Sequence, residues 1–510
     1  MQNGVHAADV RPPAASPDFR ERRVIWLLCL LAAARVFVFS AAFPFFNNVD
    51  EQIHFDLAVK YAQGHLPRSL EPISAEAVPY AALFGSPEFV GILTNQPDGR
   101  FPPPPWQQPV DEARRRMAAR IEAWHNVINH EASQPPLYYT VAGAWWRLGK
   151  WLTFRDEPLL YWLRFLNIFI VIALVWLGYA AARLVFTGQK WARLGVPALL
   201  AFLPQTAFYS IQNDVLSPVC FGAAFIGLVK WLRADVPGIR LGALTGLALA
   251  ATFLTKISNL PLLAVAAATV LFKVRLLTRT GKWRSAGTAT VVLMLCAGLP
   301  MLAWLAWCKL AFGDFTGTAA KIQFLGWTTK PFGEWWQHPI FTSRGVWTFL
   351  SGLLATFWQG ETLWHRQPLA WPVVDAIYAI LSLGLLATAV VALLARSSPS
   401  EAGQRQALRL SFGCVTAAVV FLGFLSILYD FHDCFYPSRE HPYFTSGRLM
   451  LGALIPFLLL LAYGLDRALS LARNRWARPL ALVVLILFML SSELAIDWRI
   501  FSNAYNWFHL

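Results

Sequence analysis

The stretch "VIWLLCLLAAARVFVFSAAF", residues 24–43, decides the fold class of this chain. It follows the basic residues "RERR" and is long enough to cross a bilayer as one helix. A cleaved signal peptide is the alternative, since "SAA" at 40–42 resembles a cleavage site. The run is long for the apolar part of a signal peptide and contains Arg35. We therefore favour an uncleaved first membrane helix.

The composition of the whole chain is that of a membrane protein. Of its 510 residues, 56% are hydrophobic and 14% are charged, with 23 Trp and 37 Phe, which is outside the usual range of soluble domains. The net charge of +14 does not indicate nucleic-acid binding, because Lys and Arg lie in short clusters between apolar runs. No CxxC motif or disulfide framework is present. We expect an all-α, polytopic membrane protein with membrane lipids, and no nucleic acid, among its partners.

Ten further apolar runs bring the expected number of spans to eleven: 159–182, 194–211, 215–231, 241–255, 258–272, 286–310, 371–395, 410–429, 447–466 and 479–496. Alternate short loops carry most of the Lys and Arg residues, whereas the intervening connections hold little more than Lys256 and Arg439. Basic loops stay in the cytoplasm. We therefore expect a bacterial inner-membrane protein whose N-terminus, residues 1–23, is cytoplasmic.

Two large loops, 44–158 and 311–370, are expected on the outer face, and residues 1–510 are expected to form a single membrane domain. The apolar segment 135–152 is expected to be an interfacial or re-entrant helix, because counting it as a span would invert every later loop. The first loop is also expected to hold helices at 49–63 and 111–130.

The stretch "NNVDEQIHF", residues 47–55, brings two acids and a histidine to the end of the first span. Capping explains it simply, with Asn48 as the cap and Glu51 at the third position. The alternative is chemical, since Asp50 and His54 are four residues apart and would share one face of a helix at the membrane surface. Further polar residues are expected on the same side of the membrane: Arg164, Asn213, Asp214, Lys256 and Arg448.

Several motifs resemble those of a known superfamily. "VDEQIHF" resembles the Asp-Glu motif of protein O-mannosyltransferases, and "HEASQPPLYY", 130–139, resembles a region of aminoarabinose and related lipid-linked sugar transferases. Both belong to the GT-C superfamily of membrane glycosyltransferases. "QNDVLS" and "SGRLMLGALIP" resemble a related bacterial family described only as multi-spanning membrane proteins. "EASQPP" separates His130 from the prolines, so the resemblance carries no role for His130.

The resemblance implies transfer of a sugar from a polyprenyl-phosphate donor to a lipid or glycan acceptor hydroxyl on the periplasmic face, with inversion. The first-loop acid, here Asp50, would be the base for the acceptor. Supporting acidic and imidazole groups would be Glu51, His54 and Asp214. Cations holding the donor phosphate would be Lys256, Arg448 and Arg164. Other substrate contacts would be Gln134, Tyr138 and Asn213.

Two other interpretations of the function remain open. A transporter or lipid flippase would also use many spans, but it usually carries ionisable residues near the bilayer midplane and repeated halves. A glycan polymerase or ligase would share the lipid-phosphate substrate. No cofactor is indicated with certainty. A divalent metal is a candidate, because Glu361 and His365 are spaced as two ligands on one helix face, although interfacial polar residues are commoner.

Overall fold

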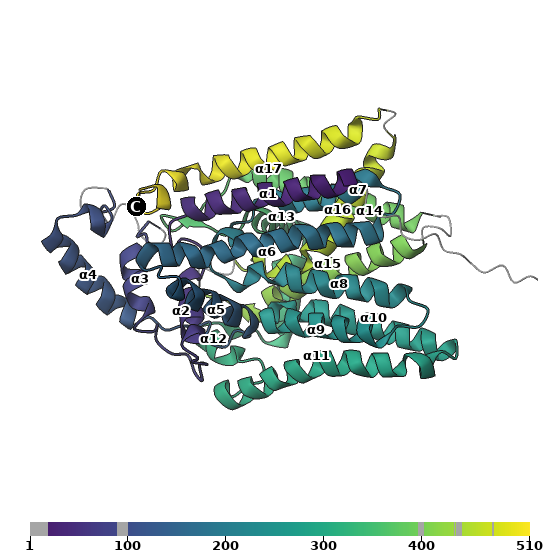
Figure 1. Cartoon of the computed structure of the whole chain (residues 1–510), viewed down its shortest axis with the longest axis horizontal. Helices are drawn as coiled ribbons and strands as arrows, with labels where there is room; N and C mark the ends of the chain where they lie inside the picture. Colours follow the sequence, from purple (N-terminus) through teal and green to yellow (C-terminus); the bar gives the residue numbers. More distant parts are fainter. Residues whose placement is uncertain are drawn as a thin grey trace, which may run out of the picture.

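The computed structural model describes residues 19–88, 100–395, 402–432, 434, 441–471 and 474–509. Long helices run along one axis, and shorter helices gather at one end, as Figure 1 shows. Within the described residues, nine helical segments are long and apolar enough to cross a membrane. Their α-helices are α1 (Phe19–Ala42), α6 (Asp156–Val185), α8 (Ser217–Arg233), α10 (Leu260–Arg279), α11 (Trp283–Phe312), α14 (Pro372–Leu394), α15 (Ala402–Leu428), α16 (Leu454–Ala468) and α17 (Ala477–Phe501).

Strands are almost absent from the described residues. β1 (Thr328–Thr329) pairs antiparallel with β4 (Tyr429–Asp430), and β2 (Leu363–Trp364) pairs antiparallel with β3 (Gln367–Pro368). The expected all-α membrane fold is therefore confirmed. Because backbone groups cannot bond to lipid, helices of this length are the structure that such apolar runs must form in a bilayer.

The expected spans at 194–211 and 241–255 correspond to shorter helices, α7 (Lys190–Ala201) and α9 (Ile239–Thr255). α7 ends early because residues 202–216 form an irregular segment with two short 3-10 helices, η3 (Thr206–Tyr209) and η4 (Asn213–Val215). Nine of the expected spans thus have a long helical counterpart, and the total of eleven stays a prediction.

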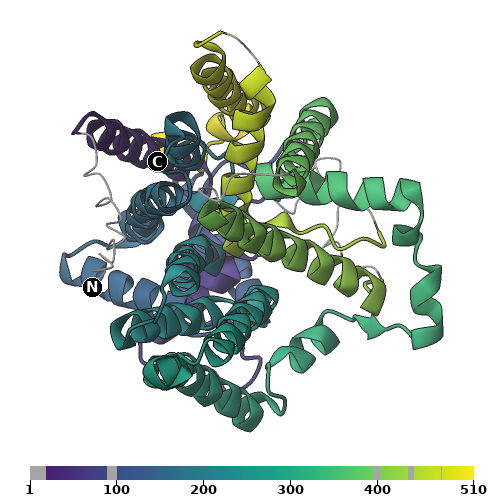
Figure 2. The ribbon, with the colours of Figure 1, turned by 90° about the vertical axis from the view of Figure 1, so that its right-hand side faces the viewer.

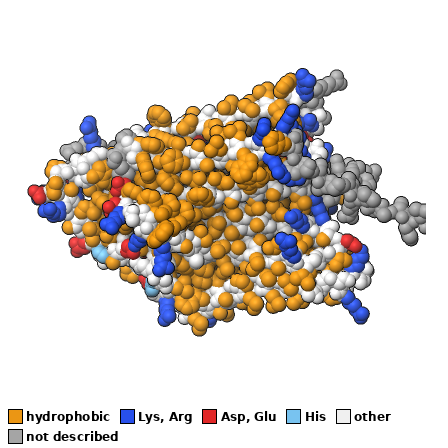
Figure 3. Space-filling model, viewed as in Figure 1, with side chains coloured by type: hydrophobic (Ala, Val, Ile, Leu, Met, Phe, Trp, Pro, Cys, Tyr) orange, Lys and Arg blue, Asp and Glu red, His pale blue; other side chains and the backbone are white. Residues whose placement is uncertain are grey.

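Loops that are far apart in sequence meet at one end of the bundle. Arg233 donates to the carbonyls of Leu184 and Gly403 at 2.6 and 2.8 Å, and Lys273 donates to that of Ala234 at 2.6 Å. These residues lie at four connections, which follow α6, α8, α10 and α14, and the charge pattern predicts that all four lie on one side. Figure 3 shows Lys and Arg side chains gathered at this end, beyond a wide hydrophobic surface. We call it the basic end.

The opposite end carries the shorter helices, and we call it the site end. The first large loop forms α2 (Glu51–Ala62), α3 (Ala77–Phe84), η2 (Pro105–Gln107), α4 (Val110–His125) and α5 (Leu137–Trp151). α5 packs against α2 and α6 and is not one of the nine candidate spans, and its expected interfacial or re-entrant position stays a prediction. The last described helical element, η11 (Trp507–His509), also lies near this end.

The second large loop forms α12 (Thr318–Phe324), η6 (Phe332–Gln337), η7 (Pro339–Phe341) and α13 (Ser343–Gln359). Figure 2 shows that the segment from α12 to η7 runs along the periphery and joins α11 to α13. The sequence did not predict α13 as a separate helix. Three short 3-10 helices flank the long helices: η5 (Ile257–Asn259) precedes α10, η9 (Gly447–Ala453) precedes α16, and η10 (Leu469–Leu471) follows α16.

Candidate active site

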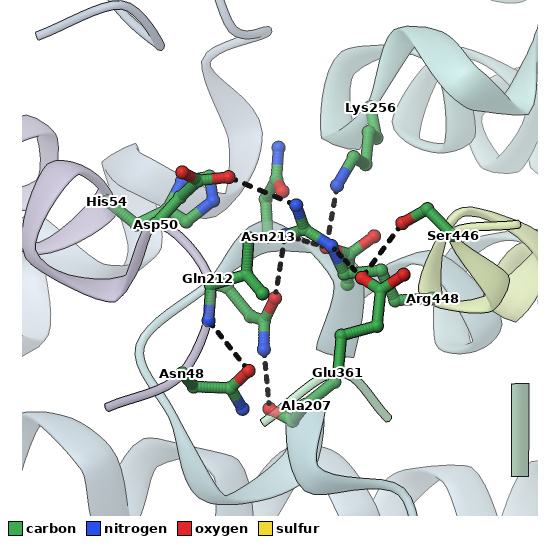
Figure 4. A network of polar contacts seen from close by, with 12 residues as sticks. Asn48, Asp50, His54, Ala207, Gln212, Asn213, Lys256, Glu361, Ser446 and Arg448 are labelled. Carbon is green, nitrogen blue, oxygen red and sulfur yellow. Dashed lines mark hydrogen bonds and ion pairs between the residues drawn. The ribbon is translucent and has the colours of Figure 1, made fainter. Parts of the chain in front are cut away.

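Arg448, on η9, is the centre of a polar network at the site end (Figure 4). Its guanidinium contacts three carboxylates: Nη2 is 3.0 Å from Asp50 Oδ2, Nε is 3.0 Å from Glu361 Oε2, and Nη1 is 3.5 Å from Asp214 Oδ2. Nη1 also donates to Gln212 Oε1 at 3.3 Å. Arg448 thus joins the first loop, the η3–η4 segment, the residues after α13 and η9, which are distant in sequence.

Gly447 explains how η9 comes so close to α13. A Cβ atom at this position would lie 2.1 Å from the backbone nitrogen of Phe357, closer than real Cβ contacts. Only glycine lets these two backbones approach this closely. The approach brings Arg448 beside Glu361, which follows the last residue of α13 by two positions.

Asp50 stands immediately before α2, whose first residue is Glu51, and not at the second position of a helix as the sequence predicts. Its backbone is left-handed, with φ of 61°, and its side chain makes no capping hydrogen bond. A non-glycine residue in this conformation is held there by its surroundings. The carboxylate lies between Arg448 and His130, whose Nε2 is 3.3 Å from Asp50 Oδ1.

Lys256 and Asp214 form a second charged pair beside Arg448. Lys256 Nζ lies 2.6 Å from Asp214 Oδ2, and both side chains are buried. Lys256 follows the last residue of α9, and Asp214 lies on η4. The structure therefore brings Asp50, Asp214, Lys256 and Arg448 together, as the sequence predicts.

The sequence did not predict a second part of the polar network, which is centred on Glu131. Glu131 forms an ion pair with Lys321 of α12 and accepts a hydrogen bond from Gln134 at 2.5 Å. Gln134 accepts one from Asn213 at 3.1 Å, which joins two of the predicted substrate-contact residues. The sequence feature that could have indicated Glu131 is "HE", residues 130–131, in "HEASQPPLYY". The distance from this pair to the two Tyr residues differs from that in the related sugar transferases.

Glu51 and Arg164 form a buried pair that corrects two predictions. Nε and Nη2 of Arg164 each lie 2.7 Å from a Glu51 oxygen, and its remaining N–H groups donate to the carbonyls of Ser40, Phe43 and Pro44. All five guanidinium donors are occupied, so Arg164 has none left for a phosphate. Glu51 is no part of a capping box. The pair fixes the start of the first loop against α6.

Asn48 is also not the helix cap that the sequence predicts. Its amide donates to the carbonyl of Thr206 at 3.0 Å and to the hydroxyl of Ser210 at 3.1 Å. These bonds attach the residues before α2 to η3. The chain preceding Asp50 is therefore held by side-chain contacts to another segment and not by the helix that follows it.

His54 and Tyr138 are buried beneath the site, with 1% of each residue exposed. Nδ1 of His54 lies 2.7 Å from the hydroxyl of Tyr139. Burial lowers the pKa of His54 to about 4, so its imidazole is neutral near pH 7. The described contacts give Tyr139, and not Asp50, as the hydrogen-bond partner of His54.

Electrostatics keep Asp50 ionised. Burial alone would raise the pKa of Asp50, but its hydrogen bond and charge contact with His130, together with the charges of Arg448 and Lys321, hold it well below its usual range. Lys321 and His130 likewise lower the pKa of Glu131 against the effect of burial. Asp50 is therefore a carboxylate that can accept a proton or a hydrogen bond from a hydroxyl group.

The described residues contain one group of acids and histidine with metal-ligand spacing. Ligand atoms of Asp50, His130 and Glu131 lie within 4.8 Å of one another. Arg448 and Lys321 already pair with the two carboxylates, so a divalent ion would compete with both cations. The predicted pair Glu361 and His365 does not share a helix face, because α13 ends at Gln359 and His365 lies in the β2–β3 turn with φ of 53°.

Solved structures show a partial likeness to this fold. ArnT from Cupriavidus metallidurans, bound to undecaprenyl phosphate, has 12% identity and a TM-score of 0.44 over 94% of this chain and 74% of its own. The archaeal oligosaccharyltransferase AglB from Archaeoglobus fulgidus, in complex with an inhibitory peptide and a dolichol-phosphate, has 9% identity and a TM-score of 0.40 over 95% of this chain and 56% of its own.

No curated protein matches the chain. Residues 31–429 match the family described as "Predicted membrane protein (DUF2142)". The match includes the first loop with Asp50, both large loops and most of the long helices. This agrees with the resemblance to a family described only as multi-spanning membrane proteins. The chain belongs to the DUF2142 family of membrane proteins.

Proposed function

We propose that this protein is a membrane glycosyltransferase that moves a sugar from a polyprenyl-phosphate donor to an acceptor hydroxyl. The observation that carries the proposal is the junction at Arg448, where one guanidinium lies between Asp50 on one side and Asp214 with Lys256 on the other. A carboxylate for the acceptor and two cations for a phosphate thus share one site at the ends of membrane helices.

The reaction needs few groups. The acceptor oxygen attacks the anomeric carbon, the bond from that carbon to the phosphate oxygen breaks, and Asp50 receives the hydroxyl proton. The leaving polyprenyl phosphate keeps the electron pair, and Arg448 and Lys256 stabilise the charge that develops on it. Attack from the side opposite the phosphate inverts the anomeric carbon.

The contacts of Arg448 give donor binding a chemical consequence. A donor phosphate that accepts hydrogen bonds from Arg448 would weaken the contact between this guanidinium and the Asp50 carboxylate, because one cation then interacts with two anions. Asp50 then loses part of the charge that holds its pKa low. Its carboxylate becomes a stronger base only when the donor is in place, which disfavours reaction without donor.

An apolar groove offers a place for the start of the prenyl chain. A cavity of about 550 Å³ has a mostly apolar lining that includes Tyr61, Leu254, Pro300, Trp304 and Trp307, with Pro136 and His65 at other positions. Leu254, in the lining, precedes Lys256 of the proposed phosphate site by two residues in the sequence. Because the basic end is expected in the cytoplasm, the reaction would take place on the periplasmic face.

The test uses purified full-length protein in detergent, with a polyprenyl-phosphate sugar and a nucleotide sugar as alternative donors. We expect transfer from the lipid-linked donor only. Arg448→Ala should reduce donor use more than Arg448→Lys, since an ammonium still supplies charge but not the fork of a guanidinium. Arg344→Ala, at an exposed arginine of α13, is the control. Equal transfer from the nucleotide sugar would overturn the proposal.

A further inference from the structure

A small cavity of about 10 Å³ lies where α17 meets η3 and the end of α13. This volume is about the smallest that can hold one water molecule or an ion of similar size. Its polar lining consists only of side chains that carry oxygen, each 7% exposed or less: Thr206, Gln359, Thr362, Glu493 and Asp497. None of these five side chains is among those that contact Arg448.

Four of the lining oxygens have no hydrogen-bond partner within the described part of the chain: Thr206 Oγ1, Gln359 Oε1, Thr362 Oγ1 and Glu493 Oε2. The other atoms of these groups are committed elsewhere. Glu493 Oε1 accepts from Arg35 and Tyr209, and Gln359 Nε2 donates to Asp375 at 2.9 Å. Buried polar atoms without partners are costly. Their shared cavity therefore indicates a ligand that satisfies several oxygens at once.

The local charge indicates the sign of that ligand. Arg35 on α1 pairs with Glu493 at 2.8 Å, and both side chains are buried. Asp497 lies one helical turn further along α17 and adds a second carboxylate. If both acids are ionised, as they would be around a bound cation, one guanidinium leaves one negative charge to be balanced inside the protein. A neutral ligand would leave this charge uncompensated, and a divalent cation would overcompensate it.

The atoms that line the cavity also indicate which class of cation it would bind. Carboxylate, amide and hydroxyl oxygens, without sulfur or imidazole, are the donors that hard cations prefer. A proton on one acid would give hydrogen-bonding capacity to one oxygen only. A cation in the centre can contact several oxygens from different segments simultaneously.

We propose that this cavity binds one hard monovalent cation of the Na⁺ class, held by oxygens of Thr206, Gln359, Thr362, Glu493 and Asp497. The cation links α17 to the two segments that support the candidate active site. Thr206 accepts a hydrogen bond from Asn48 through its backbone carbonyl at 3.0 Å, and Thr362 follows Glu361, a partner of Arg448. The proposal does not depend on the proposed function.

The experiment measures the thermal unfolding midpoint of the full chain in detergent while NaCl replaces N-methylglucamine chloride at constant ionic strength. A ligand that binds only the folded state raises the midpoint with its concentration. We expect a saturable rise of a few degrees with Na⁺ and a smaller rise with K⁺. A midpoint that is independent of Na⁺ would overturn the proposal.

Variants separate a cation from a proton. Asp497→Asn should abolish the response to Na⁺. Thr362→Val keeps shape and charge but removes one oxygen, so it should raise the half-saturating Na⁺ concentration. Asp235→Asn, at an exposed acid of the basic end, should respond as the wild type does. A Na⁺ response that Asp497→Asn leaves unchanged, or a midpoint that Asp497 makes sensitive to pH but not to Na⁺, would contradict the proposal.

Discussion

Replacement of Glu51 by Gln is expected to destabilise the protein strongly, although it changes few atoms. Each Glu51 oxygen accepts one N–H of Arg164 and one backbone N–H, from Ile211 at 3.0 Å for Oε1 and from Phe46 at 2.9 Å for Oε2. A glutamine must place its NH₂ group against one of these pairs of donors in either orientation. The guanidinium of Arg164 is then left buried without a counter-charge.

The size of the effect follows from the burial of the pair. The Glu51 side chain is 0% and the Arg164 side chain 1% exposed. Removing one partner of such a pair costs about 3 to 5 kcal/mol. Asp50→Asn should cost only about 1 kcal/mol, because its carboxylate is at the surface of the site with 19% of the side chain exposed. Near 25 °C, the difference is at least tenfold in the unfolding equilibrium.

The free energy of unfolding would be measured by titrating SDS into mixed micelles of wild type, Glu51→Gln, Arg164→Met and the double variant. The double variant should lose about 2 to 3 kcal/mol less than the sum of the single losses, since neither partner is left alone. A Glu51→Gln protein within about 0.5 kcal/mol of wild type, or additive single effects, would refute the structural role of this pair.

Three further predictions address pH, metal and topology. Because the folded-state pKa of His54 is lowered from 6.5 to about 4, the unfolded chain takes up a proton first, so stability should be full above pH 6.5 and fall by about 3 kcal/mol towards pH 4. His54→Gln should flatten this fall, and equal slopes would contradict the assignment of neutral His54. Turnover should persist after EDTA treatment, because Arg448 and Lys321 already neutralise Asp50 and Glu131; a loss restored by Mn²⁺ would instead assign a metal to this cluster. In intact cells, an impermeant thiol reagent should label a single cysteine at Trp336 but not one at Arg279, and the reverse pattern would overturn the predicted orientation.

The apolar runs predicted most of the fold because a bilayer leaves the chain little choice. A run of this length must satisfy its backbone within a helix, so the long helices were readable from hydropathy alone. α7 could not be read in this way. Its apolar run continues to residue 211, but the chain leaves the helix after Ala201 to form the irregular segment that carries Gln212 and Asp214.

The candidate site was predicted in part, by the charged residues at helix ends. Asp50, Asp214, Lys256 and Arg448 were expected on one face and lie in one network. Arg164 belonged to the same sequence pattern, yet it is fully engaged by Glu51 and three carbonyls. The sequence pattern alone cannot distinguish a charged side chain that faces the substrate from one that is paired in the interior. The difference depends on contacts between residues more than a hundred positions apart in the sequence.

The contacts of His130, Glu131 and Glu361 depend on tertiary structure. His130 and Glu131 lie in a loop without helical periodicity, and Lys321 reaches Glu131 from a different large loop. Glu361 follows a helix that the sequence did not show, so its spacing to His365 suggested a metal pair instead of a partner for Arg448. The position of α13 and its close approach to Gly447 bring Glu361 beside Arg448.

The central claim, that Asp50 carries the chemistry, is tested most directly by the turnover of purified Asp50→Asn protein with a polyprenyl-phosphate sugar donor. Asparagine keeps the size of the side chain but cannot accept the hydroxyl proton. We expect turnover to fall about 10² to 10⁴-fold, while donor binding and the unfolding midpoint stay near wild type. Asp111→Asn, at a side chain that is 92% exposed on α4, is the control and should keep full turnover. Turnover of Asp50→Asn near that of the wild type would contradict the claim.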